Sequence, residues 1–144
     1  MADTRGLAIN RTIYDFETMV YRVYDNLPAK HKHTLSELML KSVLEMRHYS
    51  NLACHYYKGA VKRKAELFSL SLGYCEDTQN SLEHLNDMGL LSDKTKAALD
   101  VELDSIREQL SRLVNSFSRQ LKGAEHHEYA SGGDSINQEE GLLP

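Results

Sequence analysis

Two short patterns of acidic residues and histidines are the first places to look for chemistry, because both could ligate a metal ion. Di-iron bundles need two Glu-x-x-His pairs on two helices and one Glu from each of two more helices. The chain holds one such pair, Glu45 and His48, in a helix-forming stretch. The second pattern, Glu-His-His-Glu at residues 125–128, offers only neighbouring side chains at the end of a helical segment, and these chelate weakly. We therefore expect no metal site and no cofactor.

The usual sequence signatures of catalysis are missing as well. The chain has no phosphate-binding glycine loop and no Gly-x-Ser-x-Gly elbow, which would mark nucleotide hydrolysis or acyl transfer. No cysteine and histidine stand in a context that supports nucleophilic catalysis. The sequence therefore favours a binding protein over an enzyme, and a metal-dependent bundle enzyme is the least favoured alternative.

Basic side chains form two clusters, and these are the candidates for binding. Lys and Arg neutralise phosphates, and a neighbouring aromatic ring can stack on a base. For either cluster alone, solvated charge at the end of a helix is the simpler explanation, and cations also stabilise a helix C-terminus. The candidate nucleic-acid-binding residues are Lys30, Lys32, Lys58, Lys62, Arg63, Lys64 and Tyr57.

Four helices are expected to position these residues. The chain has 144 residues, two prolines and 8 glycines, so residues that break helices are scarce. Apolar residues recur at helical spacing over about residues 12–26, 34–57, 60–88 and 92–121. No stretch approaches the roughly 18 apolar residues of a membrane span, and the first residues do not resemble a secretion signal. We expect a cytoplasmic protein without membrane contact.

The ends of the predicted helices carry recognisable capping residues. Thr34 and Glu37 stand in a Thr-Leu-Ser-Glu run, which predicts a capping box at the start of the second helix. Gly89 predicts a left-handed C-terminal cap for the third helix. Ser92 predicts the N-cap of the fourth helix. The connections between these helices are therefore short.

Short connections make neighbouring helices antiparallel, so the predicted fold is an all-α, antiparallel up-down four-helix bundle. We expect an N-terminal extension over residues 1–11, the bundle over residues 12–122 and an acidic, disordered tail over residues 123–144. The two basic clusters should then lie at opposite ends of the bundle. Cys54 and Cys75 should lie roughly 16 Å apart along the bundle axis, too far for a disulfide.

The distribution of charged and apolar residues along the chain indicates which partners the bundle could bind. Residues 1–122 hold all 17 Lys and Arg against 16 Asp and Glu, whereas residues 123–144 hold five acids. The bundle is thus nearly neutral, so its overall charge would not drive nucleic-acid binding by itself.

The apolar faces of residues 34–57 and 60–88 span roughly 200°, against about 100° for residues 92–121. Such breadth suits contact with another subunit, or central helices in an irregular bundle.

Two connecting segments resemble those of a bacterial four-helix-bundle family. Residues 27–37 are similar to the loop that leads into its second helix, and residues 86–94 are similar to its turn between the third and fourth helices. The family joins proteins encoded in intervening sequences of large-subunit ribosomal RNA genes to the accessory variability determinant of diversity-generating retroelements. The resemblance covers about residues 12–121.

The resemblance implies a ring-like homopentamer that acts as a non-catalytic accessory protein of a diversity-generating retroelement. It would bind the reverse transcriptase and RNA or DNA, and so support cDNA synthesis and mutagenic retrohoming. The chain departs from the strongly basic accessory branch by carrying Glu76, Asp77 and Glu83 where that branch has arginines. Residues 51–55 lack the Glu-Gly of the intervening-sequence branch, which favours the accessory branch. The alternative is a structural bundle protein of the intervening-sequence type, without direct nucleic-acid contact.

Overall fold

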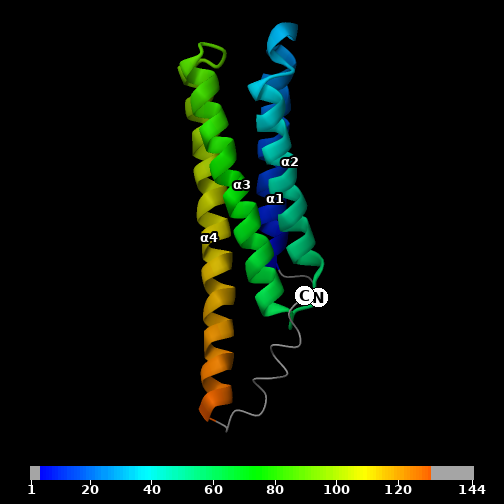
Figure 1. Cartoon of the computed structure of the whole chain (residues 1–144), viewed down its shortest axis with the longest axis vertical. Helices are drawn as coiled ribbons and strands as arrows, with labels where there is room; N and C mark the ends of the chain where they lie inside the picture. The colour runs from blue at the N-terminus through cyan, green and yellow to red at the C-terminus, as the bar shows by residue number, and fades with distance from the viewer. Residues whose placement is uncertain (1–3, 131–144) are drawn as a thin grey trace.

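The computed structural model describes the backbone of residues 4–130 and the side chains of residues 8–34 and 36–123. This part of the chain folds into α1 (Thr4–Asn26), α2 (Leu35–His55), α3 (Val61–Asp87) and α4 (Asp93–Ala130), with one short 3-10 helix, η1 (Ala29–His31), before α2. The helices run antiparallel, and each packs against two neighbours, with α4 closing the bundle against α1 (Figure 1). The predicted antiparallel up-down four-helix bundle is confirmed. No helix in the described residues is long and apolar enough to cross a membrane.

All four helices contribute one apolar stripe to the core, as their sequence spacing predicts. The rings of Phe68 and Phe117 stack with their centroids 5.9 Å apart and join α3 to α4. Ser71 in α3 donates a hydrogen bond of 2.8 Å to the backbone carbonyl of Met46 in α2. The largest fully buried side chains are Ile9, Ile13, Phe16, Met39, Met46, Leu67, Phe68, Leu82, Leu85, Leu99, Leu103 and Ile106.

The bundle begins earlier than the sequence predicted. Residues 4–11 belong to α1 rather than to an extension, because Ile9 lies four residues before Ile13 and faces the core with it. Asn10 also accepts a hydrogen bond of 2.7 Å from Ser50 in α2. A single buried residue at the correct spacing is enough to continue the apolar stripe by one turn.

The predicted capping box at the start of α2 is wrong. The Thr34 hydroxyl donates a 2.8 Å hydrogen bond back to the carbonyl of His31 instead of accepting one from α2. Ser36 donates to the same carbonyl at 2.6 Å, and the Glu37 carboxylate lies 3.8 Å from His33. The reason is η1, whose last carbonyl needs donors and competes for the hydroxyl that would otherwise cap the helix.

The turn between α3 and α4 agrees with the prediction. Gly89 has a φ of +76°, and the backbone N–H of Leu90 donates to the carbonyl of Leu85 at 3.0 Å, as in a left-handed cap. Ser92 caps α4 by accepting a 3.2 Å hydrogen bond from the backbone N–H of Thr95. The turn is therefore encoded locally, by residue types that suit their backbone positions.

α4 continues past the predicted end near residue 121 and runs to Ala130. The first part of the predicted disordered tail, residues 123–130, is therefore helical in its backbone, and residues 131–144 lie outside the described residues. Gly123 does not end the helix, because glycine tolerates helical φ and ψ at a cost of about 1 kcal/mol. Cys54 and Cys75 are not disulfide-bonded, as predicted from their separation along the axis.

Candidate nucleic-acid interface

The two predicted basic clusters lie at opposite ends of the bundle, as expected from the antiparallel fold (Figure 1). Lys30 is exposed in η1, and the Lys32 ammonium lies 5.6 Å from the centre of the Tyr24 ring. Lys58 is exposed in the α2–α3 turn, and Lys62 is half-buried at the start of α3. The fold therefore gives two separate basic sites and not one.

The Lys64 side chain is not available to a phosphate in this arrangement. Lys64 is only 4% exposed, and its ammonium lies 5.9 Å from the centre of the Phe117 ring. This geometry is a cation–π contact within the protein. Sequence reasoning grouped Lys64 with its basic neighbours, but its helical position turns the side chain toward α4.

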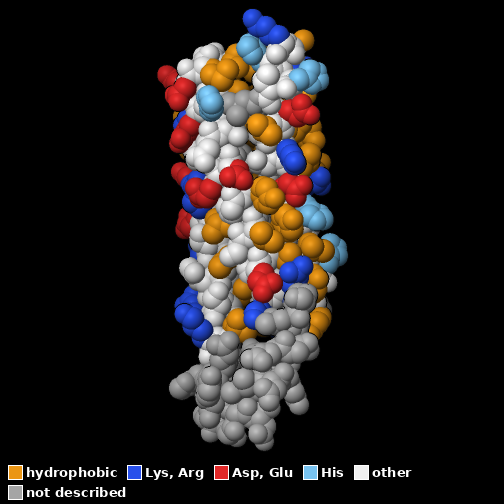
Figure 2. Space-filling view, in the orientation of Figure 1, with side chains coloured by type: hydrophobic (Ala, Val, Ile, Leu, Met, Phe, Trp, Pro, Cys, Tyr) orange, Lys and Arg blue, Asp and Glu red, His pale blue; other side chains and the backbone are white. Residues whose placement is uncertain are grey.

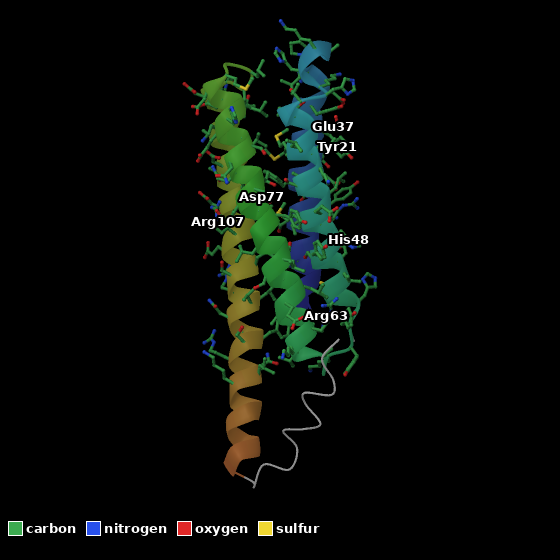
Figure 3. All side chains as sticks on the ribbon, viewed as in Figure 1. Tyr21, Glu37, His48, Arg63, Asp77 and Arg107 are labelled. Carbon is green, nitrogen blue, oxygen red and sulfur yellow. The ribbon has the colours of Figure 1, made fainter. Side chains whose placement is uncertain are left out.

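Arg63, which Figure 3 shows near the start of α3, is engaged within the protein on two sides. Its Nη1 lies 3.3 Å from Glu66 Oε2, and its guanidinium lies 6.0 Å from the centre of the Tyr56 ring. Hydrogen bonds to Tyr56 and then to Glu66 raise the pKa of Arg63. Arg63 thus remains charged while its side chain is held close to the start of α3.

Tyr57 presents the most exposed aromatic ring of the described residues and lies between the two helices of this turn. The ring is 70% exposed and packs against the turn at Gly59, where a Cβ would lie only 2.9 Å from Tyr57 Cε2. Gly59 therefore allows the ring to lie against the backbone. A ring held in this way, beside Lys58, can stack on a nucleobase.

Positive and negative side chains are strongly separated along the bundle axis, although the sum of their charges over the described part of the bundle is close to zero. We define the basic half as residues 8–15, 46–74 and 108–123, which surround the α2–α3 turn, and the acidic half as residues 16–45 and 75–107. Among the described side chains, the basic half holds nine Lys and Arg against three Asp and Glu, and the acidic half holds seven against twelve. Figure 2 shows acidic side chains over the upper part of α3 and α4 and basic ones over the lower part of α4.

Three residues that sequence reasoning missed contribute to the basic half. Arg112, Arg119 and Lys122 are exposed on α4. Arg112 pairs with Glu108 at 3.5 Å, but both side chains are more than two-thirds exposed, so water screens the pair. The signal was present as a change in the sign of the charge along the last two helices: α3 begins basic and ends acidic, and α4 is acidic over residues 93–104 and basic over residues 112–122.

A shallow groove of about 540 Å³ runs between α3 and α4 within the basic half. Apolar side chains and two serine hydroxyls line it, with a charged pair at one edge. The lining residues are Arg63, Ala65, Glu66, Ser69, Leu70, Val114 and Ser118. The groove offers surface for a flat, partly apolar group next to basic side chains.

The polar side chains of the acidic half mainly join α3 to α4. Arg107 Nε donates to Glu76 Oε1 at 2.6 Å, and Gln79 donates to Asp100 at 3.1 Å. Arg107 also contacts Asp104, and its pKa is raised, chiefly by the hydrogen bond to Glu76. Figure 3 shows Arg107 and Asp77 well above Arg63 along the bundle. These contacts set the register of the two helices.

Potential metal ligands and nucleophiles do not assemble within the described side chains. No group of three or more His, Cys, Asp and Glu lies together there, and the side chains of residues 125–128 fall outside the described set. Cys75 is buried, its thiol lies 3.9 Å from the carbonyl oxygen of Leu103, and burial raises the pKa of the thiol to about 12. Such a thiol carries little thiolate at neutral pH and is a poor nucleophile.

No protein-family model matches this sequence, and comparison with curated proteins finds no match.

Proposed function

We propose that this chain is a non-catalytic binding protein that contacts nucleic acid through its basic half. The separation of charge along the bundle is the observation that carries this proposal. Phosphates are attracted to the basic half and repelled by the acidic half, so a polyanion would approach one end of the molecule. Lys58 and Lys62 are the proposed phosphate contacts of the α2–α3 turn, and Tyr57 is the proposed stacking ring.

The biological role in this proposal comes from the resemblance of the connecting segments. The chain would serve a diversity-generating retroelement as its accessory protein, binding the reverse transcriptase and RNA or DNA during cDNA synthesis and mutagenic retrohoming. A reverse transcriptase must itself bind nucleic acid, so it presents basic surface that suits the acidic half of the bundle. Lys30 and Lys32 would form a second, separate contact with nucleic-acid phosphates at that end of the bundle.

Association of several copies belongs to the same proposal. Leu38 and Leu70 are 59% and 46% exposed on α2 and α3, and between these helices the Tyr49 and Tyr74 rings stack at 5.7 Å. Figure 2 shows hydrophobic side chains gathered over this face. We propose that this α2–α3 face contacts another copy, in a ring-like pentamer as the resemblance implies.

The nucleic-acid contact can be tested with a fluorescently labelled single-stranded RNA. We expect the wild-type protein to bind with strong salt dependence, and the double variant Lys58→Glu, Lys62→Glu to lose at least tenfold in affinity at low salt. The matched control is Lys41→Glu, Lys94→Glu, which changes the net charge equally in the acidic half. A wild-type protein that does not bind RNA at low salt would remove nucleic acid from the proposal.

A second candidate function is a structural bundle protein of the intervening-sequence type, without nucleic-acid contact. The observation in its favour is that Lys64 and Arg63 are used inside the protein. A gene for a reverse transcriptase and a pair of variable repeats beside the gene for this protein would favour the retroelement role. Co-purification of the two proteins would test it directly.

A further inference from the structure

We infer that the nucleic-acid surface extends from the α2–α3 turn across the groove onto α4, where Arg112, Arg119 and Lys122 contact phosphates of a single strand. This inference rests on the proposed nucleic-acid contact and names residues and a ligand form for it. The three side chains are exposed, and among the described residues no acidic group pairs with Arg119 or Lys122. The charges of Arg119 and Lys122 are therefore available to a ligand, and the pair of Arg112 with Glu108 is exposed and screened by water.

The spacing along α4 presents these charges as a row. Arg112 and Arg119 are seven residues apart, which places them on the same side of the helix about 10.5 Å from each other. Lys122 follows almost one turn later. Side chains spaced by one and two turns can reach successive phosphates of a strand that follows the helix.

Packing of α3 on α4 brings this row beside the α2–α3 turn. The Lys64 ammonium and the Phe68 ring both lie against Phe117, at 5.9 Å from its centre, and so hold the start of α3 against this part of α4. Lys62 lies one turn before Glu66 on α3, and Lys122 lies one turn after Ser118 on α4, so each shares a helix face with a residue that lines the groove. Each wall of the groove thus continues into a basic side chain.

The groove itself favours nucleic acid over a simple polyanion. Ala65 and Val114 provide apolar surface, and Ser69 and Ser118 provide hydroxyls, which suit the face and edge of a nucleobase. Tyr57 adds an exposed ring at the same end of the bundle. Only a single strand leaves its bases free for such contacts, because a duplex stacks and pairs them.

The test compares two triple variants that change the charge of the protein by the same amount. The first is Arg112→Glu, Arg119→Glu, Lys122→Glu in the basic half. The matched control is Arg22→Glu, Lys41→Glu, Lys94→Glu, whose three exposed side chains lie in the acidic half. The probes are a labelled 20-nucleotide oligothymidylate and an abasic strand of equal length, with inorganic polyphosphate as competitor, and circular dichroism checks folding.

We expect the first variant to bind oligothymidylate 10-fold to 100-fold more weakly at 0.1 M salt, with a log–log salt slope shallower by about two. The affinity of the control variant for oligothymidylate should change less than threefold. The wild-type protein should bind the abasic strand more weakly than oligothymidylate. If the glutamate variant does not fold, Arg112→Gln, Arg119→Gln, Lys122→Gln replaces it, with an expected loss of three- to tenfold.

Each result that differs from this expectation would overturn a different part of the proposal. Equal losses in both triple variants would show that only net charge matters and would overturn the inference. Full binding by the α4 variant, with weak binding by Lys58→Glu, Lys62→Glu, would confine the site to the turn and leave the proposed function standing. Equal binding of the abasic strand and equal competition by polyphosphate would identify a general polyanion site. Failure of the wild-type protein to bind any strand would overturn the proposed nucleic-acid contact itself.

Discussion

Glu17 is the acidic residue that the fold buries most deeply among the described side chains, and it links α1 to α2. It is 4% exposed, and its Oε2 lies 3.1 Å from Arg47 Nε, without the alignment of a hydrogen bond. Burial raises the pKa of the Glu17 carboxyl, and the charge of Arg47 opposes this only in part. Because the folded pKa exceeds the unfolded one, the stability that Glu17 contributes is present at low pH and is lost as the pH rises through the folded pKa.

We therefore predict that Glu17→Gln raises the free energy of unfolding at pH 7 and that this gain disappears as the pH falls below the unfolded pKa. Arg47→Ala should lower the free energy of unfolding at pH 7 by about 1–3 kcal/mol, because a buried carboxylate loses its partner. Urea unfolding between pH 3.5 and pH 7 measures both effects. Asp15→Asn removes the charge of an exposed pair with Arg11 and is the control. It should change the free energy of unfolding little at any of these pH values. The same pH profile for the wild type and Glu17→Gln would refute this account of Glu17.

At the level of the helices, the turn between α3 and α4 depends most clearly on one residue. Gly89 has the positive φ that ends α3, and Asn86 and Ser92 complete the turn through hydrogen bonds to Leu91 and Thr95. A residue with a Cβ meets no neighbouring atom at Gly89. Any cost of substitution there must come from the backbone conformation and not from a clash.

We expect Gly89→Ala to lower the free energy of unfolding by about 1–2 kcal/mol, the cost of a left-handed conformation for an L-residue. Gly123→Ala is the matched control, since Gly123 lies in α4 without a positive φ and with open space around it. That control should raise the stability by up to about 1 kcal/mol. Urea unfolding at one pH compares the two, and equal effects of the same sign would contradict the assigned cap.

On the scale of the whole molecule, charge divides the surface along the bundle axis, and large apolar side chains are exposed on all four helices. The α2–α3 face exposes Leu38 and Leu70 beside the stacked rings of Tyr49 and Tyr74, and Val101 is exposed outside this face, on α4. Exposed apolar patches of this kind commonly mark interaction sites. Self-association through the α2–α3 face follows as an expectation.

We predict that the wild-type protein sediments as an oligomer at micromolar concentration in the absence of nucleic acid. Leu70→Glu should sediment as a single subunit with unchanged helix content, because a carboxylate cannot be buried in an apolar contact at low cost. Val101→Glu, at an exposed position on α4, is the control and should remain oligomeric. A wild-type protein that sediments as a single subunit would remove ring assembly from the proposal.

Local patterning predicted most of the fold. The apolar stripes identified four helices, and the short connections gave their antiparallel order, because both depend on residues close together in the chain. Thr34 was misassigned because the carbonyl of His31 competes for its hydroxyl. Ile9 was missed because one apolar residue is a weak signal until its neighbours on other helices are known.

The candidate site was only partly predictable. Residue types were enough to place Lys58, Lys62 and Tyr57 at one end of the bundle, since they stand beside a turn. The burial of Lys64 and the addition of Arg112 and Arg119 depended on how α3 packs against α4. Antiparallel packing brings together segments that are about 50 residues apart in the chain. It gathers like charges from different helices at the same end of the bundle. Residues 1–122 are nearly neutral when their charges are summed along the sequence, yet they fold into a bundle with one basic and one acidic half.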